Sequence, residues 1–448
     1  MTQHPAPLIV RTESNDDDAP FHGDKMGRKL IADQLTAYID RLRAGAVVAV
    51  TAPWGEGKSW FGNNWYRQLK KSHRTAFIDA FKGDYLEDPF ILIASELSGL
   101  LDKEHEDKPL MKKAIELGKV ILPPIAKAVV NIIGGKVIEN LDAANNEIRE
   151  GLKSATEKAA DHSAQWLEAR FKDQACQAAS MEGFKTALTE AAKKSEQPVV
   201  VFIDELDRCK PTFAVTLIER LKHFFDVHNV VFILLVNRSQ LERSIEAYYG
   251  VGTDGHEYLK KFVNIWFTLP APLSADLLGN QRIEEFVKHT LNGYKIDQTK
   301  SEAISHFTHD CTIWAAVFKM SLRDIEQMCT LFVLSGFERR TFGYYLMALK
   351  TMHPTTFDGI RRCDKAAHSE ARTLLYQGLP NARNKYDEYP FSIINAVDEM
   401  HRLIVEDIKL QDLPILADMW EDLVSGYRDQ HRAVSLLSEK IDLPLSAK

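Results

Sequence analysis

The chain contains 448 residues, of which 45% are hydrophobic and 27% are charged, and its formal net charge is −7. A chain of this length holds two or three domains with a substantial core, and the composition excludes a disordered or fibrous protein. The negative charge gives no support to nucleic-acid binding, which would need a local basic face. Five widely spaced cysteines without a Cys-x-x-Cys pair indicate reduced thiols rather than disulfides or a zinc site.

The N-terminal segment, residues 1–22, is expected to be a flexible tail. It contains three prolines and an acidic run, and it begins without the basic and then apolar pattern of a signal peptide, so we expect a cytoplasmic protein. Residues 24–44 then carry apolar side chains at helical spacing, which predicts an amphipathic helix. These side chains are Leu30, Ile31, Leu35, Tyr38, Ile39 and Leu42.

A short apolar run at 46–50 opens into a glycine-containing loop that ends in Lys58 and Ser59. This pattern predicts a strand, a phosphate-binding loop and a helix from about Ser59, because glycines let successive N–H groups surround an anion and the helix adds its N-terminal dipole. The candidate nucleotide-binding residues here are Pro53, Trp54, Gly55, Glu56, Gly57, Lys58, Ser59 and Trp60.

Two residues of this loop receive specific roles. Lys58 is expected to reach the β- and γ-phosphates, and the Ser59 hydroxyl to bind Mg²⁺. Ala52 stands where the usual pattern has glycine. Because alanine resists positive φ, the entry turn must be free of strain at this position or have a different shape.

A second apolar run, 199–203, ends in Asp204 and Glu205. A continuous apolar run suits a strand that is buried on both faces of a parallel sheet, and acids at its carboxyl end lie where such sheets bind ligands. Asp204 is placed to hold Mg²⁺ through water, and Glu205 to act as the general base on an attacking water. Alone, the two acids would be a loop-capping pair, but the phosphate-binding loop favours the nucleotide interpretation.

These motifs resemble those of the KAP family of P-loop NTPases, in the STAND and AAA-like branch. The likeness covers about residues 23–275, with a weaker continuation to about 345. It rests on Trp54-Gly55-Glu56-Gly57-Lys58-Ser59, on 203–209 with Pro211, on 258–263 leading to 267–270, and on 24–28. The sequence departs from the family at Ala52, Glu205 and Asn237, where the family often has glycine, aspartate and aspartate.

The fold expected from the motifs and the resemblance is α/β: a parallel sheet flanked by helices, with a helical insertion and a helical C-terminal domain. Residues 75–81 predict a second strand, and Pro89 a helix from about 90 to 101. The insertion is placed at about 103–183, between the two motifs, within an NTPase domain of 23–275. Its apolar run at 120–135 is interrupted by Lys127 and Asn131, so we expect a soluble hairpin or surface helix rather than a membrane span.

A further buried strand, 230–236, ends at Asn237 and Arg238. Asn237 can sense the γ-phosphate or orient the water. Arg238 either binds phosphate, as the matching arginine of related signalling NTPases does, or is a surface arginine that starts a helix. Arg208 belongs to the family motif, and we expect it to pair structurally with Asp207.

Residues 276–448 are predicted to form a helical lid and interaction domain, because strand signals fade and apolar residues recur with helical period. Arg323 lies in a segment that resembles the one from which AAA-type lids project a sensing arginine. It is therefore a candidate γ-phosphate sensor, the alternative being a helix-start residue paired with Asp324.

The sequence thus predicts a Mg²⁺-dependent ATPase with Glu205, Lys58 and Asp204 as catalytic residues. We expect ATP rather than GTP as the nucleotide. The expected role is a nucleotide-controlled switch or assembly motor that forms homo-oligomers or works with an effector protein. The resemblance implies bacterial anti-phage defence. The alternatives are a nucleotide-stabilised scaffold and a membrane-associated assembly protein.

Overall fold

The computed structural model describes residues 19–86, 88–102, 108–121, 179–224, 227–271, 277–294, 301–335, 341–382, 389–406 and 408–424, with 434, 437, 438 and 441. The chain divides into two compact units. The sheet unit is Arg28–Pro53 with Lys58–Pro270, and the helical unit is Met1–Gly27, Trp54–Gly57 and Ala271–Lys448.

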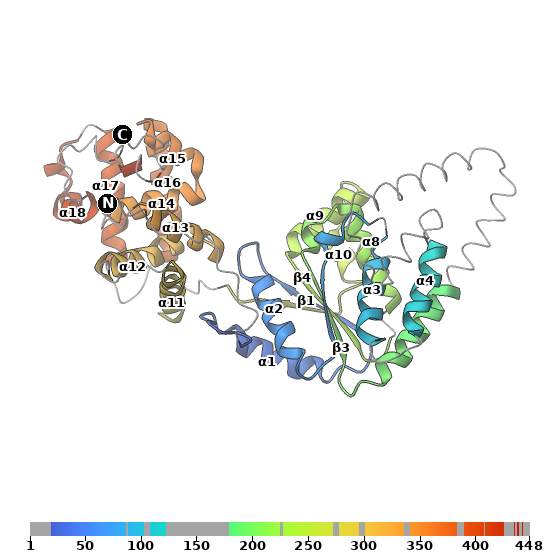
Figure 1. Ribbon diagram of the computed structural model, residues 1–448. Helices are drawn as coiled ribbons and strands as arrows, with labels where there is room; N and C mark the ends of the chain where they lie inside the picture. Colours follow the sequence, from blue (N-terminus) through green and yellow to red (C-terminus); the bar gives the residue numbers. More distant parts are fainter. Residues whose placement is uncertain are drawn as a thin grey trace, which may run out of the picture. The chain divides into compact units, whose positions relative to one another are not determined.

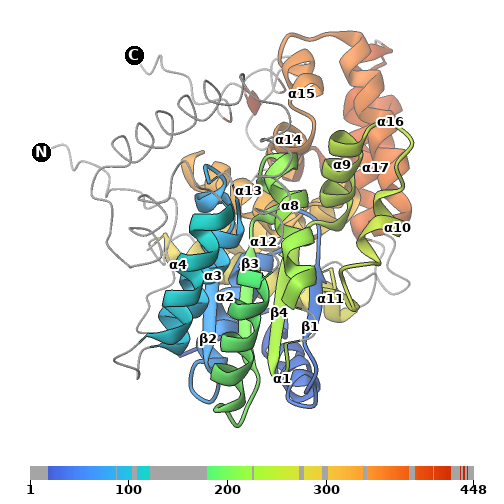
Figure 2. The ribbon, with the colours of Figure 1, turned by 90° about the vertical axis from the view of Figure 1, so that its right-hand side faces the viewer.

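The sheet unit is built on a five-stranded parallel sheet in the order β2-β3-β4-β1-β5. Figure 2 shows β2, β3, β4 and β1 side by side. The strands are β1 (Ala46–Thr51), β2 (Thr75–Asp79), β3 (Val199–Asp204), β4 (Val230–Val236) and β5 (Ile265–Thr268). The four predicted strands are confirmed, although β2 ends two residues early. We did not predict β5, which has only four residues, none of them buried.

Helices cover both faces of this sheet (Figure 1). On one side lie α1 (Arg28–Ile39) and α2 (Lys58–Leu69). On the other lie α3 (Phe90–Leu101), α4 (Pro109–Ile121), α8 (Pro211–Leu221) and α9 (Arg238–Tyr249). The short α10 (Gly255–Leu259) follows α9. The predicted helix after Pro89 is confirmed as α3, and α2 begins at Lys58, one residue before the predicted start.

The two faces of the sheet are fixed by alternation along each strand. One set of alternate strand residues packs on α3, α8 and α9 in a single core. On the α2 face, the Trp65 ring lies edge-on to Phe202 with the ring centroids 5.2 Å apart. α2 approaches β4 so closely that a Cβ on Gly62 would lie 2.0 Å from Leu235 Cδ1. The phosphate-loop helix is therefore held firmly against the strands.

The first predicted helix is confirmed as α1, but it is shorter than 24–44 and it buries a different face from the predicted one. Its buried residues are Arg28, Ala32 and Ile39. Leu30 and Tyr38, which the pattern placed on the apolar face, are 64% and 41% exposed. That part of the prediction is wrong because the face that α1 buries runs through Arg28, Ala32 and Ile39, which leaves Leu30 on the exposed side.

Most of the predicted insertion, including the apolar run at 120–135 from residue 122 onward, lies outside the described residues. The described parts are α4 and a helical stretch at 179–193. Within the described part of the chain, no helix combines the length and the apolar character that crossing a membrane requires.

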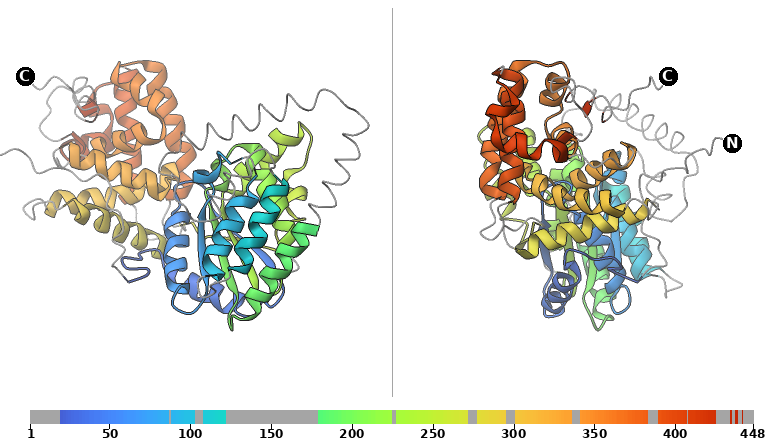
Figure 3. Two further views of the ribbon diagram at one scale, coloured as in Figure 1. Left: turned by 45° about the vertical axis from the view of Figure 1, so that its right-hand side comes forward. Right: turned by 90° about the vertical axis from the view of Figure 1, so that its left-hand side faces the viewer.

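The helical unit agrees with the predicted helical character of the chain after residue 276. Its helices are α11 (Leu277–Gly293), α12 (Ser301–Phe318), α13 (Leu322–Leu334), α14 (Thr341–Met352), α15 (Pro354–Arg361), α16 (Lys365–Ala382), α17 (Tyr389–Val405) and α18 (Pro414–Val424). They share one apolar core. Figure 3 shows α16 and α17, in orange to red, running side by side.

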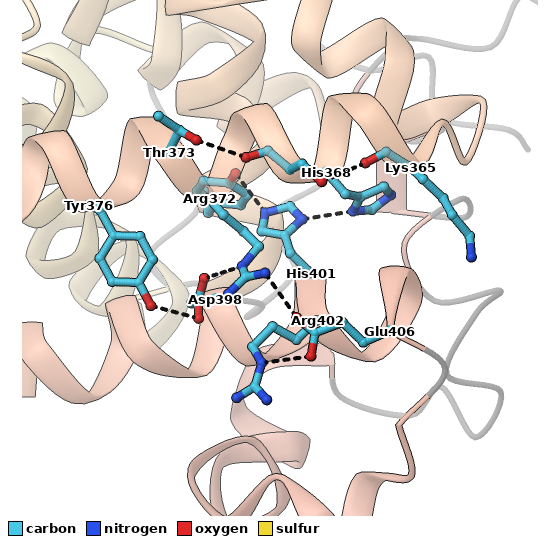
Figure 4. A network of polar contacts seen from close by, with 11 residues as sticks. Lys365, His368, Arg372, Thr373, Tyr376, Asp398, His401, Arg402 and Glu406 are labelled. Carbon is cyan, nitrogen blue, oxygen red and sulfur yellow. Dashed lines mark hydrogen bonds and ion pairs between the residues drawn. The ribbon is translucent and has the colours of Figure 1, made fainter.

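A polar network joins α16 and α17 inside this unit (Figure 4). His401 and His368 are fully buried, and their Nδ1 atoms lie 2.8 Å apart. The other ring nitrogen of His401 bonds the Tyr345 hydroxyl at 2.8 Å. Nearby, the Arg372 guanidinium donates to Asp398 at 2.7 Å. The two helices are thus joined by hydrogen bonds as well as by apolar packing.

Candidate functional site

The loop between β1 and α2 has the backbone conformation that its glycines permit. Gly55 and Gly57 have φ values of 88° and 75°, a left-handed conformation that disfavours residues with a Cβ. Ala52 does not have a positive φ. Its N–H continues the pairing of β1 with β4 by donating to the Val236 carbonyl at 3.4 Å. The entry turn is therefore free of strain at Ala52, which accounts for alanine in place of glycine.

The Lys58 ammonium is folded onto the carbonyls of its own loop. It donates to Ala52 at 2.9 Å and to Pro53 at 3.3 Å, and the residue is 7% exposed. Burial lowers the pKa of Lys58, and this effect is opposed by nearby carboxylates, of which Asp207 acts most strongly and Asp204 next. An anion bound beside this desolvated cation would favour its charged form further.

Asp204 lies at the carboxyl end of β3 with its side chain buried at 4% exposure. Burial raises its pKa to about 6, although the neighbouring Ser59 hydroxyl and the hydrogen bond from the Glu205 N–H act in the opposite direction. The Glu205 N–H lies 2.8 Å from Asp204 Oδ1. This desolvated carboxylate would be favoured in its charged form by a nearby cation.

Glu205 has an unusual backbone conformation for a residue with a side chain. Its φ and ψ are 62° and 19°, in the left-handed region, and it immediately precedes the 3₁₀ turn Leu206–Arg208. Its carboxylate accepts a hydrogen bond of 3.4 Å from the Ser59 hydroxyl and forms an ion pair with Arg208. Non-glycine residues in this region are uncommon and concentrate at functional sites.

Sequence reasoning missed two features of this turn. We expected Arg208 to pair with Asp207 and did not foresee the ion pair that Arg208 forms with Glu205. Asp207 received only a structural role, yet it is the carboxylate that most raises the pKa of Lys58. The signal that could have identified it is its spacing, because a 3₁₀ turn returns the third residue after Asp204 to the same edge of the sheet.

The end of β4 supplies the next candidates. Asn237 is 9% exposed and precedes α9, and Arg238 is the first residue of that helix. Arg238 Nε donates to Glu242 at 2.8 Å, and the guanidinium lies 4.5 Å from the centre of the Trp266 ring and contacts His256. These contacts hold Arg238 at the start of α9. Its binding to phosphate stays a prediction.

The remaining candidates belong to the helical unit, which includes residues 54–57. Trp54 is 44% exposed. The Gly55 carbonyl accepts a hydrogen bond of 3.2 Å from the backbone N–H of Arg323 at the start of α13. The alternative prediction for Arg323 was a pair with Asp324. The Asp324 carboxylate instead accepts hydrogen bonds of 2.8 Å and 2.7 Å from Ser321, which close a capping box.

Within the sheet unit the structure brings together Lys58, Ser59, Asp204 and Glu205 at the carboxyl edge of the sheet. Pro53 contributes a carbonyl to Lys58. Trp60 and Glu56 are half-buried, Trp60 in the first turn of α2 and Glu56 in the loop. The site therefore combines a buried cation and a hydroxyl at the start of α2 with two carboxylates at the end of β3. This arrangement is suited to binding a phosphate chain with its metal ion.

Comparisons with solved structures find distant likenesses, three of which are described here. The Aeropyrum pernix ORC2 protein in ADPNP–ADP complexes aligns with a TM-score of 0.34 and 10% identity over 96% of both chains. A DNA replication initiation factor aligns at 0.33 and 11% over 93% of this chain and 94% of that one. The ADP form of the Aeropyrum protein aligns at 0.32 and 10% over 98% and 96%. Similarity this low carries no argument about function.

A search of curated proteins finds no match. The model of the KAP family P-loop domain, in contrast, matches residues 28–336, more than half of the chain. This range contains the parallel sheet, the phosphate-binding loop and the two acids at the end of β3. The chain therefore belongs to the KAP family of P-loop domains.

Proposed function

We propose that this protein is a Mg²⁺-dependent ATPase whose nucleotide state controls its assembly with itself or with an effector protein. The observation that carries the proposal is the cluster of Lys58, Ser59, Asp204 and Glu205 at one edge of the sheet. Each member has the chemistry that phosphoryl transfer to water requires: a cation for the phosphates, oxygen ligands for a metal ion, and a base for the water.

Lys58 and the loop amides would bind the triphosphate. The ammonium of Lys58 now donates to two loop carbonyls, which are neutral acceptors. Exchange of these carbonyls for phosphate oxygens would give charge-assisted hydrogen bonds, which are about twice as strong as neutral ones. Because burial lowers the pKa of Lys58, an anion would also restore the preference for its charged form.

The residues present fit a magnesium ion. The Ser59 hydroxyl and the Asp204 carboxylate are hard oxygen ligands, and the buried carboxylate of Asp204 has a pKa that a cation would lower. Mg²⁺ normally keeps several waters and takes one or two protein ligands beside phosphate oxygens, so two ligands suffice. When bound, the ion neutralises charge that develops on the phosphates.

Glu205 would act on the attacking water. Its carboxylate accepts the proton as the water oxygen attacks the γ-phosphorus, and the bond from the γ-phosphorus to the bridging oxygen breaks to give ADP and phosphate. The left-handed backbone at Glu205 fixes where this carboxylate emerges from β3. Strain of this kind is held at functional positions because the surrounding structure over-determines it.

The same residues supply a switch. The Ser59 hydroxyl donates to Glu205 here, and it would lose this bond when it turns to a metal ion. Nucleotide occupancy is thereby coupled to the position of Glu205, and so to the turn Leu206–Arg208 and α8 that follow it. The anti-phage role and the effector partner implied by the family resemblance belong to this proposal as its biological setting.

A nucleotide-stabilised scaffold is the second candidate. It is favoured by one observation, that the Glu205 carboxylate is engaged by both Ser59 and Arg208. A site in which these contacts persist would bind nucleotide without activating water.

The switch is tested by measuring the molecular mass of the wild-type protein and of Glu205→Gln without nucleotide, with Mg²⁺ and ADP, and with Mg²⁺ and ATP. We expect Glu205→Gln to stay in the ATP-dependent assembly while the wild type returns to the ADP state. Lys58→Ala is the control and should not respond to nucleotide. Masses that are independent of nucleotide in both proteins, with nucleotide bound, would contradict the switch and support the scaffold.

A further inference from the structure

The carboxylate of Glu205 has a different partner at each of its two oxygens. Oε1 accepts the hydrogen bond of 3.4 Å from the Ser59 hydroxyl, and Oε2 forms the ion pair with the Arg208 guanidinium. Oε2 is buried, and the described residues give it no aligned hydrogen bond. Because a buried carboxylate oxygen without a partner is unfavourable, the charge of Arg208 stabilises Oε2 in this position.

The turn after β3 fixes where Arg208 lies relative to Glu205. The backbone N–H of Arg208 donates to the Glu205 carbonyl at 3.1 Å, which closes the 3₁₀ turn. Leu206 is fully buried in the core of the sheet unit. Just after the turn, the Lys210 N–H donates to the Asp84 carboxylate at 3.0 Å. The backbone that carries Arg208 is therefore held on both sides.

Metal binding would act on only one of the two contacts of Glu205. The Ser59 hydroxyl is a proposed Mg²⁺ ligand, and its hydrogen bond to Oε1 would be lost when it turns to the ion. Arg208 cannot bind the ion, because a guanidinium has donors and no acceptor. Its ion pair with Oε2 would persist, so Oε1 becomes free to accept a proton while Oε2 stays in place.

Arg208 lies close enough to the phosphate-binding residues to influence them. Burial is the main cause of the lowered pKa of Lys58, and the charge of Arg208 acts in the same direction. Two roles for Arg208 are therefore open at this edge of the sheet, binding of phosphate and orientation of Glu205. The ion pair with the buried Oε2 favours orientation.

We infer that Arg208 is a positioning residue for Glu205. Through its ion pair with Oε2, it keeps the carboxylate in one orientation while Oε1 passes from the Ser59 hydroxyl to the attacking water. Placement of this kind matters because a displacement of about 1 Å can lower a rate about 10²-fold. This role rests on the proposed ATPase function and adds to it the residue that orients the base.

The test compares kcat for ATP hydrolysis and the affinity for ATP in the wild type and three variants. Arg208→Met removes the charge, so kcat should fall at least about tenfold with ATP affinity within about twofold of the wild type. Unchanged affinity also shows that the variant is folded. Arg208→Lys keeps a charge beside Oε2 and should lose no more than about threefold in kcat. Lys210→Met removes a neighbouring exposed cation that pairs with Asp84, and should leave both quantities unchanged.

A double variant separates orientation of Glu205 from a general loosening of the turn. If Arg208 acts through the Glu205 carboxylate, Arg208→Met should have no further effect in a protein that already carries Glu205→Gln. Phosphate release with the enzyme in excess over ATP measures the residual rates, which should agree within about twofold. A purely structural role would lower the rate in both backgrounds.

Three results would overturn the role of Arg208 while leaving the ATPase function intact. Turnover in Arg208→Met equal to that of the wild type would show that Glu205 needs no such partner. A rise in turnover would make Arg208 a restraint on Glu205, and a loss of ATP affinity would make it a phosphate-binding residue. Absence of Mg²⁺-dependent turnover in the wild type would contradict the proposed function itself, and the role of Arg208 with it.

Discussion

Gly57 and Ala52 show how single residues determine the phosphate-binding loop. Gly57 has a φ of 75°, whereas Ala52 does not have a positive φ. A Cβ on Gly57 would have room, since the nearest atom, Leu322 Cδ1, would lie 3.7 Å away. The requirement for glycine at this position is therefore conformational and not steric.

We expect Gly57→Ala to weaken ATP binding at least tenfold. A left-handed conformation costs a residue with a Cβ about 1–2 kcal/mol, and a shift of the loop to relieve it would misdirect the amides. Ala52→Gly is the matched control and should bind ATP within about twofold of the wild type. Calorimetric titration measures both, and an improved affinity in Ala52→Gly would show that our account of the entry turn is wrong.

The buried carboxylate of Asp204 gives a pH dependence with a definite sign. Its folded pKa is about 6 against an ordinary value of 3.8, so between these values the folded state binds more protons than the unfolded state. The stability of the nucleotide-free protein should therefore fall as the pH rises from about 4 to about 6.

Asp204→Asn removes this titration. We expect the free energy of unfolding of the variant, relative to wild type, to rise by up to about 3 kcal/mol between pH 4 and pH 8. Denaturant unfolding at the two pH values measures the difference, and pH 4 is the internal reference because the wild-type carboxyl is largely protonated there when folded. A variant that loses stability relative to wild type as the pH rises would refute the assignment.

The residues of the phosphate site could be predicted from the sequence, but several of their contacts could not. Lys58, Ser59, Asp204 and Glu205 could be identified because their spacing from a strand end is itself the signal. The Arg208–Glu205 ion pair and the effect of Asp207 on Lys58 could not, because both depend on how the turn after β3 folds back. The same holds for Arg238, whose packing on Trp266 joins α9 to β5.

At the scale of the elements, α16 and α17 contain two buried histidines, His368 and His401, whose titration should affect stability. Burial lowers the pKa of His368 to about 4, and it lowers that of His401 well below its usual value, with the His368 charge as a further cause. Between a pH of about 4 and 6.5 the unfolded state binds more protons, so stability should be lost as the pH falls below 6.5.

His368→Phe, which keeps the ring shape, should reduce this loss. We expect the fall in the free energy of unfolding between pH 7.5 and pH 5 to shrink by as much as about 2 kcal/mol relative to wild type. His306→Gln, at a partly exposed histidine of α12, is the control and should keep the wild-type dependence. Equal pH dependence in His368→Phe and wild type would contradict a neutral, buried His368.

Strands and helices could be predicted where the apolar pattern was long, either as a continuous run or with a helical period. β1, β3 and β4 are continuous apolar runs that a parallel sheet buries on both faces. α13, in the part of the chain predicted to be helical, has six buried apolar residues at helical spacing. β5 was not predicted because its four residues are too few to show a strand pattern. It is a strand through its pairing with β1. In α1, Leu30 shows that helical spacing identifies a helix without fixing which face the fold will bury.

At the scale of the whole molecule, the chain combines a P-loop sheet unit with a helical unit, and residues 54–57 of the phosphate-binding loop group with the helices. The proposed switch rests on the hydrogen bond from Ser59 to Glu205, and it requires that the cluster at the end of β3 turns over ATP.

The most direct measurement is the rate of phosphate release from ATP by the wild type and by Glu205→Gln, with ATP affinity measured on both. We predict Mg²⁺-dependent turnover in the wild type, a loss of about 10²–10⁴-fold in Glu205→Gln, and similar ATP affinity in the two proteins. Equal turnover in both, or ATP binding without turnover in the wild type, would contradict the assignment of Glu205 as the base.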